Sequence, residues 1–261
     1  MQKEIKQPTG VQSLEVGLSV FDVLATESRP MMLKDIAEQI DMHPAKVHRY
    51  LVSLVRSGYA QQFSNGRYGV GDKALVLGLA TVRRTEHLQQ AQKDLLALQQ
   101  EINECVQVAK WTSLGPLVVQ FLEPNHPVVI TARVGSLMPV LRSATGNVFA
   151  SYLPEHMVKP LMQQEWAESA AGGVVIRPRD WADFERMKAQ ILQEGVGAIE
   201  GNLISGVNAL SAPIFDANGE MVFAITCMGN AEHIQLDPEG AHAQAIKATA
   251  AKISRQLGHQ A

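Results

Sequence analysis

Residues 44–58 constrain the fold of this chain most, because a helical apolar face and a basic face share one short stretch. Apolar residues recur there at i, i+3, i+4, i+7 and i+8, the spacing of one helix face: Val47, Tyr50, Leu51, Leu54 and Val55. Pro44 suits the first helical position, and Gly58 is the expected left-handed terminator. The other side of the helix carries Lys46, His48, Arg49, Ser53 and Arg56.

The charge around this helix is one-sided. Residues 42–71 contain no Asp or Glu, although the whole chain has a net charge of −3 and residues 87–261 hold 12 Lys or Arg against 17 Asp or Glu. A basic stretch beside an acidic remainder is typical of a polyanion-binding module attached to a separate domain. On charge alone, a chance fluctuation on a solvated surface remains the alternative.

The neighbouring segments predict a winged helix-turn-helix. Residues 13–27 have the pattern of a helix, with one apolar face formed by Leu14, Leu18, Phe21 and Leu24, and residues 33–40 form a second, short helix. After Gly58, Asn65-Gly66 predicts a tight hairpin with both central residues at positive φ and with Arg67 at its tip. The basic helix then fits the major groove of duplex DNA. The predicted contacts are Lys46, His48, Arg49, Ser53, Arg56, Arg67 and Tyr68.

Three runs carry a family resemblance: 33–40 (LKDIAEQI), 47–59 (VHRYLVSLVRSGY) and 66–71 (GRYGVG). They resemble the IclR family of bacterial transcriptional regulators. Met32 departs from the usual Ser or Thr helix cap, a loss of about 1 kcal/mol. Ala45 and Lys46 replace small hydroxyl residues, which indicates a shifted base preference at Lys46.

The rest of the chain reads as an α+β domain. We expect strands at 105–113, 116–123, 128–133, 197–203, 207–215 and 221–227, and helices at 146–152, 154–164, 180–193 and 238–257. This order predicts an antiparallel sheet flanked by helices, and the resemblance implies a GAF-like effector domain. The expected domains are a winged helix at 9–71, a linker helix at 72–86, and an effector-binding and oligomerisation domain at 87–259.

A helical stripe follows the linker: Leu88, Ala91, Leu95, Leu98 and Ile102. It is coiled-coil-like but too short to stand alone. Two alternatives remain open, packing against its own C-terminal domain or against a partner subunit. An operator with two-fold symmetry requires paired heads, so we expect a homodimer or a dimer of dimers.

Two further runs resemble the effector domain of the family: 135–146, and 195–227 with its paired strands. The resemblance implies a sensor for a small organic acid, often aromatic, with a pocket wall at Met138, Ala144, Thr145, Ile199, Val207, Ala209, Thr226 and Met228. The backbone N–H groups of 144–146 offer a carboxylate site at a helix start, and Arg142 or Arg133 could pair with the anion. Simple core packing is the alternative for Met138, Val207 and Met228. Ile199 stands where some members have an acidic residue, which favours an apolar effector.

Catalytic and metal-binding patterns are missing from the sequence. It contains no GxSxG, HExxH or GxxxxGK[ST] motif. His43 and His48 lie five apart, which is not a useful ligand spacing, and Cys227 lies in an apolar run typical of packing. We therefore expect no enzyme activity, no metal and no cofactor; the competing hypothesis is a small-molecule enzyme with an accessory winged helix. Two cysteines, no apolar run of membrane-spanning length and no signal-like start predict a cytoplasmic protein.

Overall fold

The computed structural model describes residues 10–27, 29–83, 86–127, 132–173, 175–201 and 203–260, with the side chains of 80–90 excepted. Most of the strand expected at 128–133 lies outside the described residues. The chain divides into two compact units, one reaching to Thr85 and one starting at Glu86.

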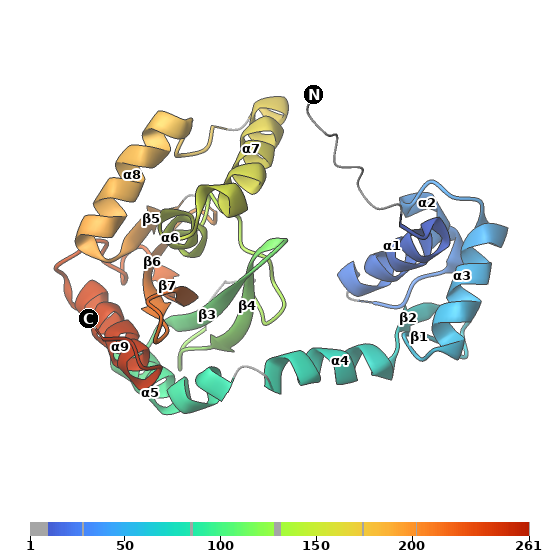
Figure 1. The fold of residues 1–261 in the computed structure, drawn as a ribbon, viewed down its shortest axis with the longest axis horizontal. Coiled ribbons are helices and arrows are strands. Elements are labelled where there is room, and N and C mark those ends of the chain that lie inside the picture. The colour runs from blue at the N-terminus through green and yellow to red at the C-terminus, as the bar shows by residue number, and fades with distance from the viewer. Residues whose placement is uncertain are drawn as a thin grey trace, which may run out of the picture. The chain divides into compact units, whose positions relative to one another are not determined.

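The first unit is the expected winged helix-turn-helix (Figure 1). Its core is formed by buried side chains of the three leading helices and the hairpin, among them Val20, Leu24, Ile36, Val47, Leu51 and Tyr68. In chain order the elements are α1 (Gln12–Thr26), α2 (Leu33–Gln39), α3 (Pro44–Arg56), β1 (Ala60–Gln62), β2 (Tyr68–Val70) and α4 (Asp72–Arg83).

The buried face of α1 differs from the predicted one. Val20 and Leu24 are buried, whereas Leu14 is 61% exposed and Leu18 is 49% exposed. The helix carries several valines beside its leucines, so more than one row of side chains has helical apolar spacing. The row that includes Val20 packs against α3 and β2, and the amino-terminal leucines remain at the surface of this unit.

The hairpin is also built differently from the expected two-residue turn. Phe63 and Arg67 close a three-residue loop, and only Gly66 in it has a positive φ, 79°. The N–H of Gly66 donates to the carbonyl of Phe63, which makes an ordinary turn followed by one left-handed residue. The extra residue removes the need for Asn65 to adopt the left-handed conformation.

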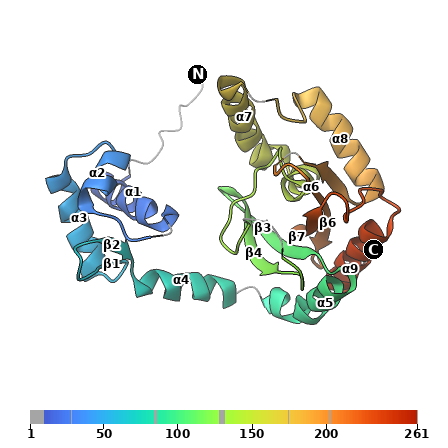
Figure 2. The ribbon, with the colours of Figure 1, turned by 180° about the vertical axis from the view of Figure 1, so that it is seen from behind.

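The second unit is an antiparallel sheet between two helical layers, as predicted (Figures 1 and 2). Its described strands form one five-stranded sheet in the order β4-β3-β7-β6-β5. Helices α5 and α9 cover one face, and α6 and α8 pack on the other. The elements are α5 (Glu86–Ile102), β3 (Cys105–Thr112), β4 (Gly115–Leu122), α6 (Ala144–Tyr152), α7 (Glu155–Gly172), α8 (Trp181–Glu194), β5 (Gly197–Glu200), β6 (Val207–Phe215), β7 (Met221–Asn230) and α9 (Ala241–Gln256).

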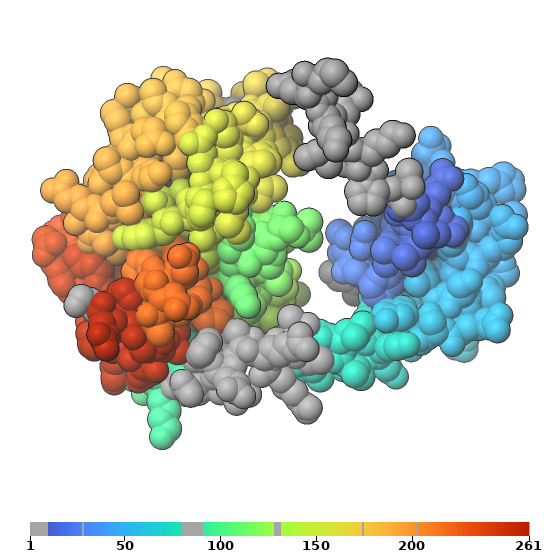
Figure 3. Space-filling model, in the orientation of Figure 1, coloured from blue at the N-terminus to red at the C-terminus, as the bar shows by residue number. Residues whose placement is uncertain are grey.

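The stripe on α5 packs inside its own unit. Ala91, Leu95 and Leu98 are buried in the core that α5 shares with α9 and the sheet; the side chain of Leu88 lies outside the described part. Two other elements have unexpected lengths. Helix α7 continues to Gly172, and β5 stops at Glu200 because Gly201 takes a positive φ of 57°. Figure 3 shows α7 and α8 forming the outer surface on one side of this unit.

Candidate DNA-binding face and effector pocket

The exposed side of α3 is cationic. Val47 and Leu51 are fully buried, which turns the opposite side outward. The exposed residues there are Lys46, His48, Arg49, Ser53 and Arg56. The Nδ1 atom of His43 accepts a hydrogen bond from the Ala45 N–H at 3.2 Å and so caps the helix ahead of Pro44. Among the described residues, none of the Lys and Arg side chains of α3 forms an ion pair.

The two hairpin residues predicted to contact DNA, Arg67 and Tyr68, are less exposed than expected. Tyr68 is only 4% exposed, and its backbone pairs with Met31 at 2.8 Å in both directions. The prediction that the Tyr68 side chain contacts DNA is therefore wrong, because this side chain belongs to the core. Arg67 is half-buried, and its Nη1 donates to the Pro30 carbonyl at 3.2 Å, which anchors it beside the α1–α2 connection.

All nine residues expected around the effector line one cavity of about 40 Å³ on the α6 side of the sheet. Strand register brings them together. Ala209 lies opposite Ile199 on one side and Met228 on the other, and Thr226 is the next residue along β7 that faces the same way. Gln107, Ser143, Leu203 and Ile204 complete the lining, and the sequence analysis did not identify them.

A chain of buried hydrogen bonds crosses the polar part of this cavity. Gln107 Nε2 donates to Thr145 Oγ1 at 2.9 Å, and Thr145 Oγ1 lies 2.8 Å from Thr226 Oγ1. Thr226 Oγ1 in turn donates to Ser211 Oγ at 2.9 Å. These side chains come from β3, α6, β7 and β6, so the network fixes the helix start against the sheet.

Two polar atoms at the cavity lack a partner. Among the described residues, neither the buried Oε1 of Gln107 nor the buried Nε of Arg142 has a hydrogen-bond partner. A buried polar atom without a partner costs about 1–3 kcal/mol. Two residues of this largely apolar lining, Gln107 and Arg142, therefore carry one unsatisfied acceptor and one unsatisfied donor.

The helix start offers less to an anion than predicted. Ser143 Oγ caps α6 by accepting the Gly146 N–H at 2.9 Å, so that N–H is already satisfied. Gly146 also lies tightly under the preceding loop, since an added Cβ would come within 2.2 Å of the Pro139 carbonyl oxygen. Arg133 is exposed and does not line the cavity, which leaves Arg142 as the lining cation.

The loop that carries Arg142 is held by a carboxylate. Glu165 accepts the backbone N–H groups of Val140 and Leu141, and burial raises the pKa of this carboxyl. The two cysteines are buried, and burial raises the pKa of each thiol to about 12. Both are therefore packed, protonated thiols. No helix in the described part is long and apolar enough to cross a membrane.

Two family models match the chain. The model of the IclR helix-turn-helix domain matches residues 13–63, and the model described as bacterial transcriptional regulator IclR C-terminal matches residues 79–255. Among curated proteins, the transcriptional repressor IclR of Escherichia coli K12 is 23% identical over 87% of this chain and 83% of its own length.

Solved structures give the same match. The crystal structure of HmgR from Pseudomonas aeruginosa is 37% identical, with a TM-score of 0.61 over 96% of this chain and 99% of that chain. An IclR homologue from Microbacterium hydrocarbonoxydans, solved in complex with 4-hydroxybenzoate, is 17% identical, with a TM-score of 0.77 over 94% of this chain and 98% of its own.

Proposed function

The chain belongs to the IclR family of bacterial transcriptional regulators, and from that membership we propose how its two units work. It is a regulator with a helix-turn-helix DNA-binding domain and a C-terminal effector domain. In our proposal, α3 reads the major groove, and a small hydroxylated aromatic acid in the cavity alters operator binding. The site of action is the cytoplasm, where the chromosome lies.

The unpaired cations of α3 support the DNA-binding part. Lys46 and Arg49 stand on its exposed side without an acidic partner among the described residues, which is the arrangement that phosphate and guanine edges require. His48, Ser53 and Arg56 extend the same face. Arg67, in the hairpin and anchored at Pro30, would contact the DNA backbone beside the major groove.

Quantitative gel shifts on the upstream region of the gene, over a salt series, test this assignment. Lys46→Ala and Arg49→Ala should each weaken binding by about 1–3 kcal/mol if they contact bases, or lower the salt slope by about 0.9 if they contact phosphates. Lys110→Ala, an exposed charge on β3, is the matched control. Unchanged affinity and slope in both α3 variants would contradict the proposal.

The unsatisfied Nε of Arg142 and the unsatisfied Oε1 of Gln107 support the effector-binding part of the proposal. A carboxylate satisfies the guanidinium, and a phenolic hydroxyl satisfies the Gln107 carbonyl. The apolar wall of Ile199, Val207 and Met228 suits a ring between them. The relative solved with 4-hydroxybenzoate supports this ligand class. Ligand pockets usually measure about 300–1,000 Å³, so the walls of this small cavity must open for the ring to enter.

Calorimetric titration with 4-hydroxybenzoate and with 4-hydroxybenzamide tests the role of Arg142. For the wild type, loss of the carboxylate should weaken binding by roughly tenfold to a hundredfold, because a hydrogen bond to a charged group is worth about 1.5–3 kcal/mol. Arg142→Gln should remove that preference, while Arg133→Gln keeps it. Equal discrimination in Arg142→Gln would refute the pairing without touching the DNA-binding proposal.

A further inference from the structure

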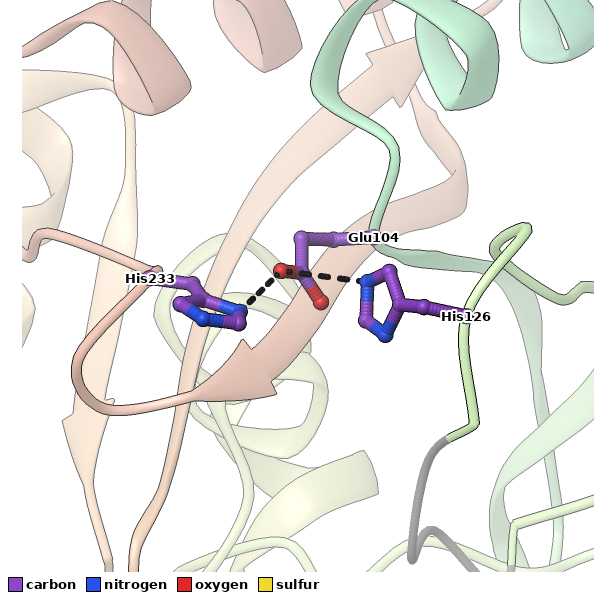
Figure 4. A group of neighbouring side chains, drawn as sticks. All are labelled: Glu104, His126 and His233. Carbon is purple, nitrogen blue, oxygen red and sulfur yellow. Dashed lines mark hydrogen bonds and ion pairs between the residues drawn. The ribbon is translucent and has the colours of Figure 1, made fainter.

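Three titratable side chains that are far apart in the sequence meet at one end of the sheet in the second unit. Glu104 lies between α5 and β3, His126 follows β4, and His233 follows β7. One ligand atom from each lies within 4.8 Å of the others. Figure 4 shows the two imidazole rings on either side of the carboxylate.

The carboxylate of Glu104 is deeply buried. Its side chain is 5% exposed; Oε1 accepts from His233 Nδ1 at 2.9 Å and lies 3.6 Å from His126 Nε2. The other oxygen, Oε2, has no hydrogen-bond partner among the described residues. The backbone makes room for it, since a Cβ added at Gly229 would come within 2.2 Å of Oε2. A buried charge of this kind is costly unless it is paired or coordinates a metal.

The two rings leave the site open to ions. His126 is 33% exposed and His233 is 54% exposed at their side chains. His126 Nε2 also lies 2.9 Å from the Asn103 carbonyl, so this nitrogen faces two oxygen atoms. A bare lone pair there would be repelled by both oxygens. A metal ion or a proton at Nε2 resolves the conflict.

The two distances from the Glu104 carboxylate bracket the spacing of ligands around a tetrahedral metal ion. Ligands at about 2.0–2.2 Å from a tetrahedral zinc lie about 3.4 Å apart. Glu104 Oε1 lies 2.9 Å from His233 Nδ1 and 3.6 Å from His126 Nε2, and the ligand atoms of the three residues all lie within 4.8 Å of one another. We propose that Glu104, His126 Nε2 and His233 Nδ1 form a site for Zn²⁺ or a similar imidazole-binding cation, with water in the remaining position. Mg²⁺ and Ca²⁺ prefer all-oxygen sites and should not compete. The bound ion would tie the end of α5 to the loops after β4 and β7.

Equilibrium dialysis of the full-length chain, without a histidine tag, against Zn²⁺ alone tests the site. We expect one high-affinity ion per chain. His126→Gln and His233→Gln should each bind at least about tenfold more weakly, since even outer-shell changes alter metal affinity by about 10–100-fold. His156→Gln, an exposed histidine on α7, is the matched control. Variants that retain the wild-type affinity, or a wild type that binds no zinc, would overturn the proposal.

A second measurement needs no variant. Nitrogen NMR of histidine-labelled wild-type chain distinguishes metal at Nε2 from metal at Nδ1. Zinc should shift Nε2 of one ring and Nδ1 of another, and leave the remaining histidines unchanged; Mg²⁺ and Ca²⁺ should shift none. If zinc shifts neither the Nε2 signal nor the Nδ1 signal and the two rings only take up protons, the cluster is a proton-bridged ion pair. The metal assignment then fails.

Discussion

Single side chains decide what the cavity can admit. Ala209 is the smallest of the strand residues that line it, and it lies between Ile199 and Met228 in the register of the sheet. A methyl group there leaves the space that a ring would enter. The hydroxyls of Thr145 and Thr226 hold the polar side in place.

Ala209→Trp should therefore abolish the response to 4-hydroxybenzoate and leave DNA binding intact, because the indole fills the space between the two walls. Gel shifts with and without ligand measure both properties, and circular dichroism confirms folding. Ala198→Trp, an exposed change on β5 whose register partner is Leu210, is the control and should respond normally. An undiminished response in Ala209→Trp would remove the pocket assignment.

At this scale the cavity lining was predicted by the family resemblance and not by a local sequence pattern. Strands β6 and β7 are buried along almost their whole length, so the burial pattern does not show which residues face α6, and Ala209 and Thr226 were placed together by the resemblance. Tyr68 was misplaced because a three-residue strand gives no alternation to follow. Gln107 and the Glu104 cluster escaped notice because their neighbours come from distant strands and loops, which no local pattern reveals.

Among the elements, the start of α6 depends on one close approach. The loop at Pro139 and Val140 crosses the first turn of the helix at Gly146, where any side chain would overlap its backbone. The same loop carries Arg142, so its path determines where the cation points.

Gly146→Ala should lower the free energy of unfolding by about 1–3 kcal/mol, the usual cost of forcing an extra methyl group into a packed site. Urea denaturation followed by circular dichroism measures it. Gly78→Ala in α4 is the control, because nothing lies within 4 Å of its added Cβ; alanine favours a helix, so this change should be neutral or stabilising by up to about 1 kcal/mol. Equal losses in the two variants would contradict the close approach.

Helices α5 and α9 are joined by an ion pair. Lys252 Nζ lies 2.6 Å from Asp94 Oδ1, and Gln256 donates to Oδ2 at 2.7 Å. The hydrogen bond from Lys252 is the main cause that holds the pKa of Asp94 below its ordinary value of 3.8, against the opposing effect of burial. A lowered folded-state pKa means that the stabilisation is complete above the unfolded pKa and disappears as the pH falls through the folded one.

Asp94→Asn should accordingly destabilise the chain at pH 7 by about 0.5–1 kcal/mol, and the difference from the wild type should shrink as the pH falls below 3.8. Urea midpoints measured across an acid series test this. Glu101→Gln, an exposed change on the same helix, is the control and should give no such trend. A constant difference at every pH would exclude the ion pair as the cause.

Element bounds were predictable where sequence punctuation is strong. Gly58, Gly195 and the Asn-Gly hairpin marked ends that the structure confirms within a residue or two. The turn type at Asn65 and the length of α7 were not predictable, because each depends on how the chain packs beyond the local sequence.

The whole molecule must present its DNA-binding unit in pairs if the operator has two-fold symmetry. On α4, Leu75 and Val76 are each 63% exposed, and Leu14 and Leu18 on α1 are also exposed. Exposed apolar side chains can mark a contact surface, and we propose that a second copy of the chain covers those of α4.

Leu75→Glu combined with Val76→Glu should shift the chain toward monomer and weaken operator binding, since buried like charges oppose association. Analytical ultracentrifugation and gel shifts measure the two effects. Leu114→Glu, at an exposed turn of the second unit, is the control and should leave both unchanged. A double variant that sediments like the wild type would place the interface elsewhere.

The small volume of the cavity, about 40 Å³, also determines how much effector the proposed response requires. The free energy needed to separate its walls reduces the free energy of binding, so the apparent dissociation constant is higher than that of a preformed pocket. A regulator of this kind responds only when the concentration of its effector is high. A shorter side chain at a wall position such as Met228 would lower the effector concentration that produces a response.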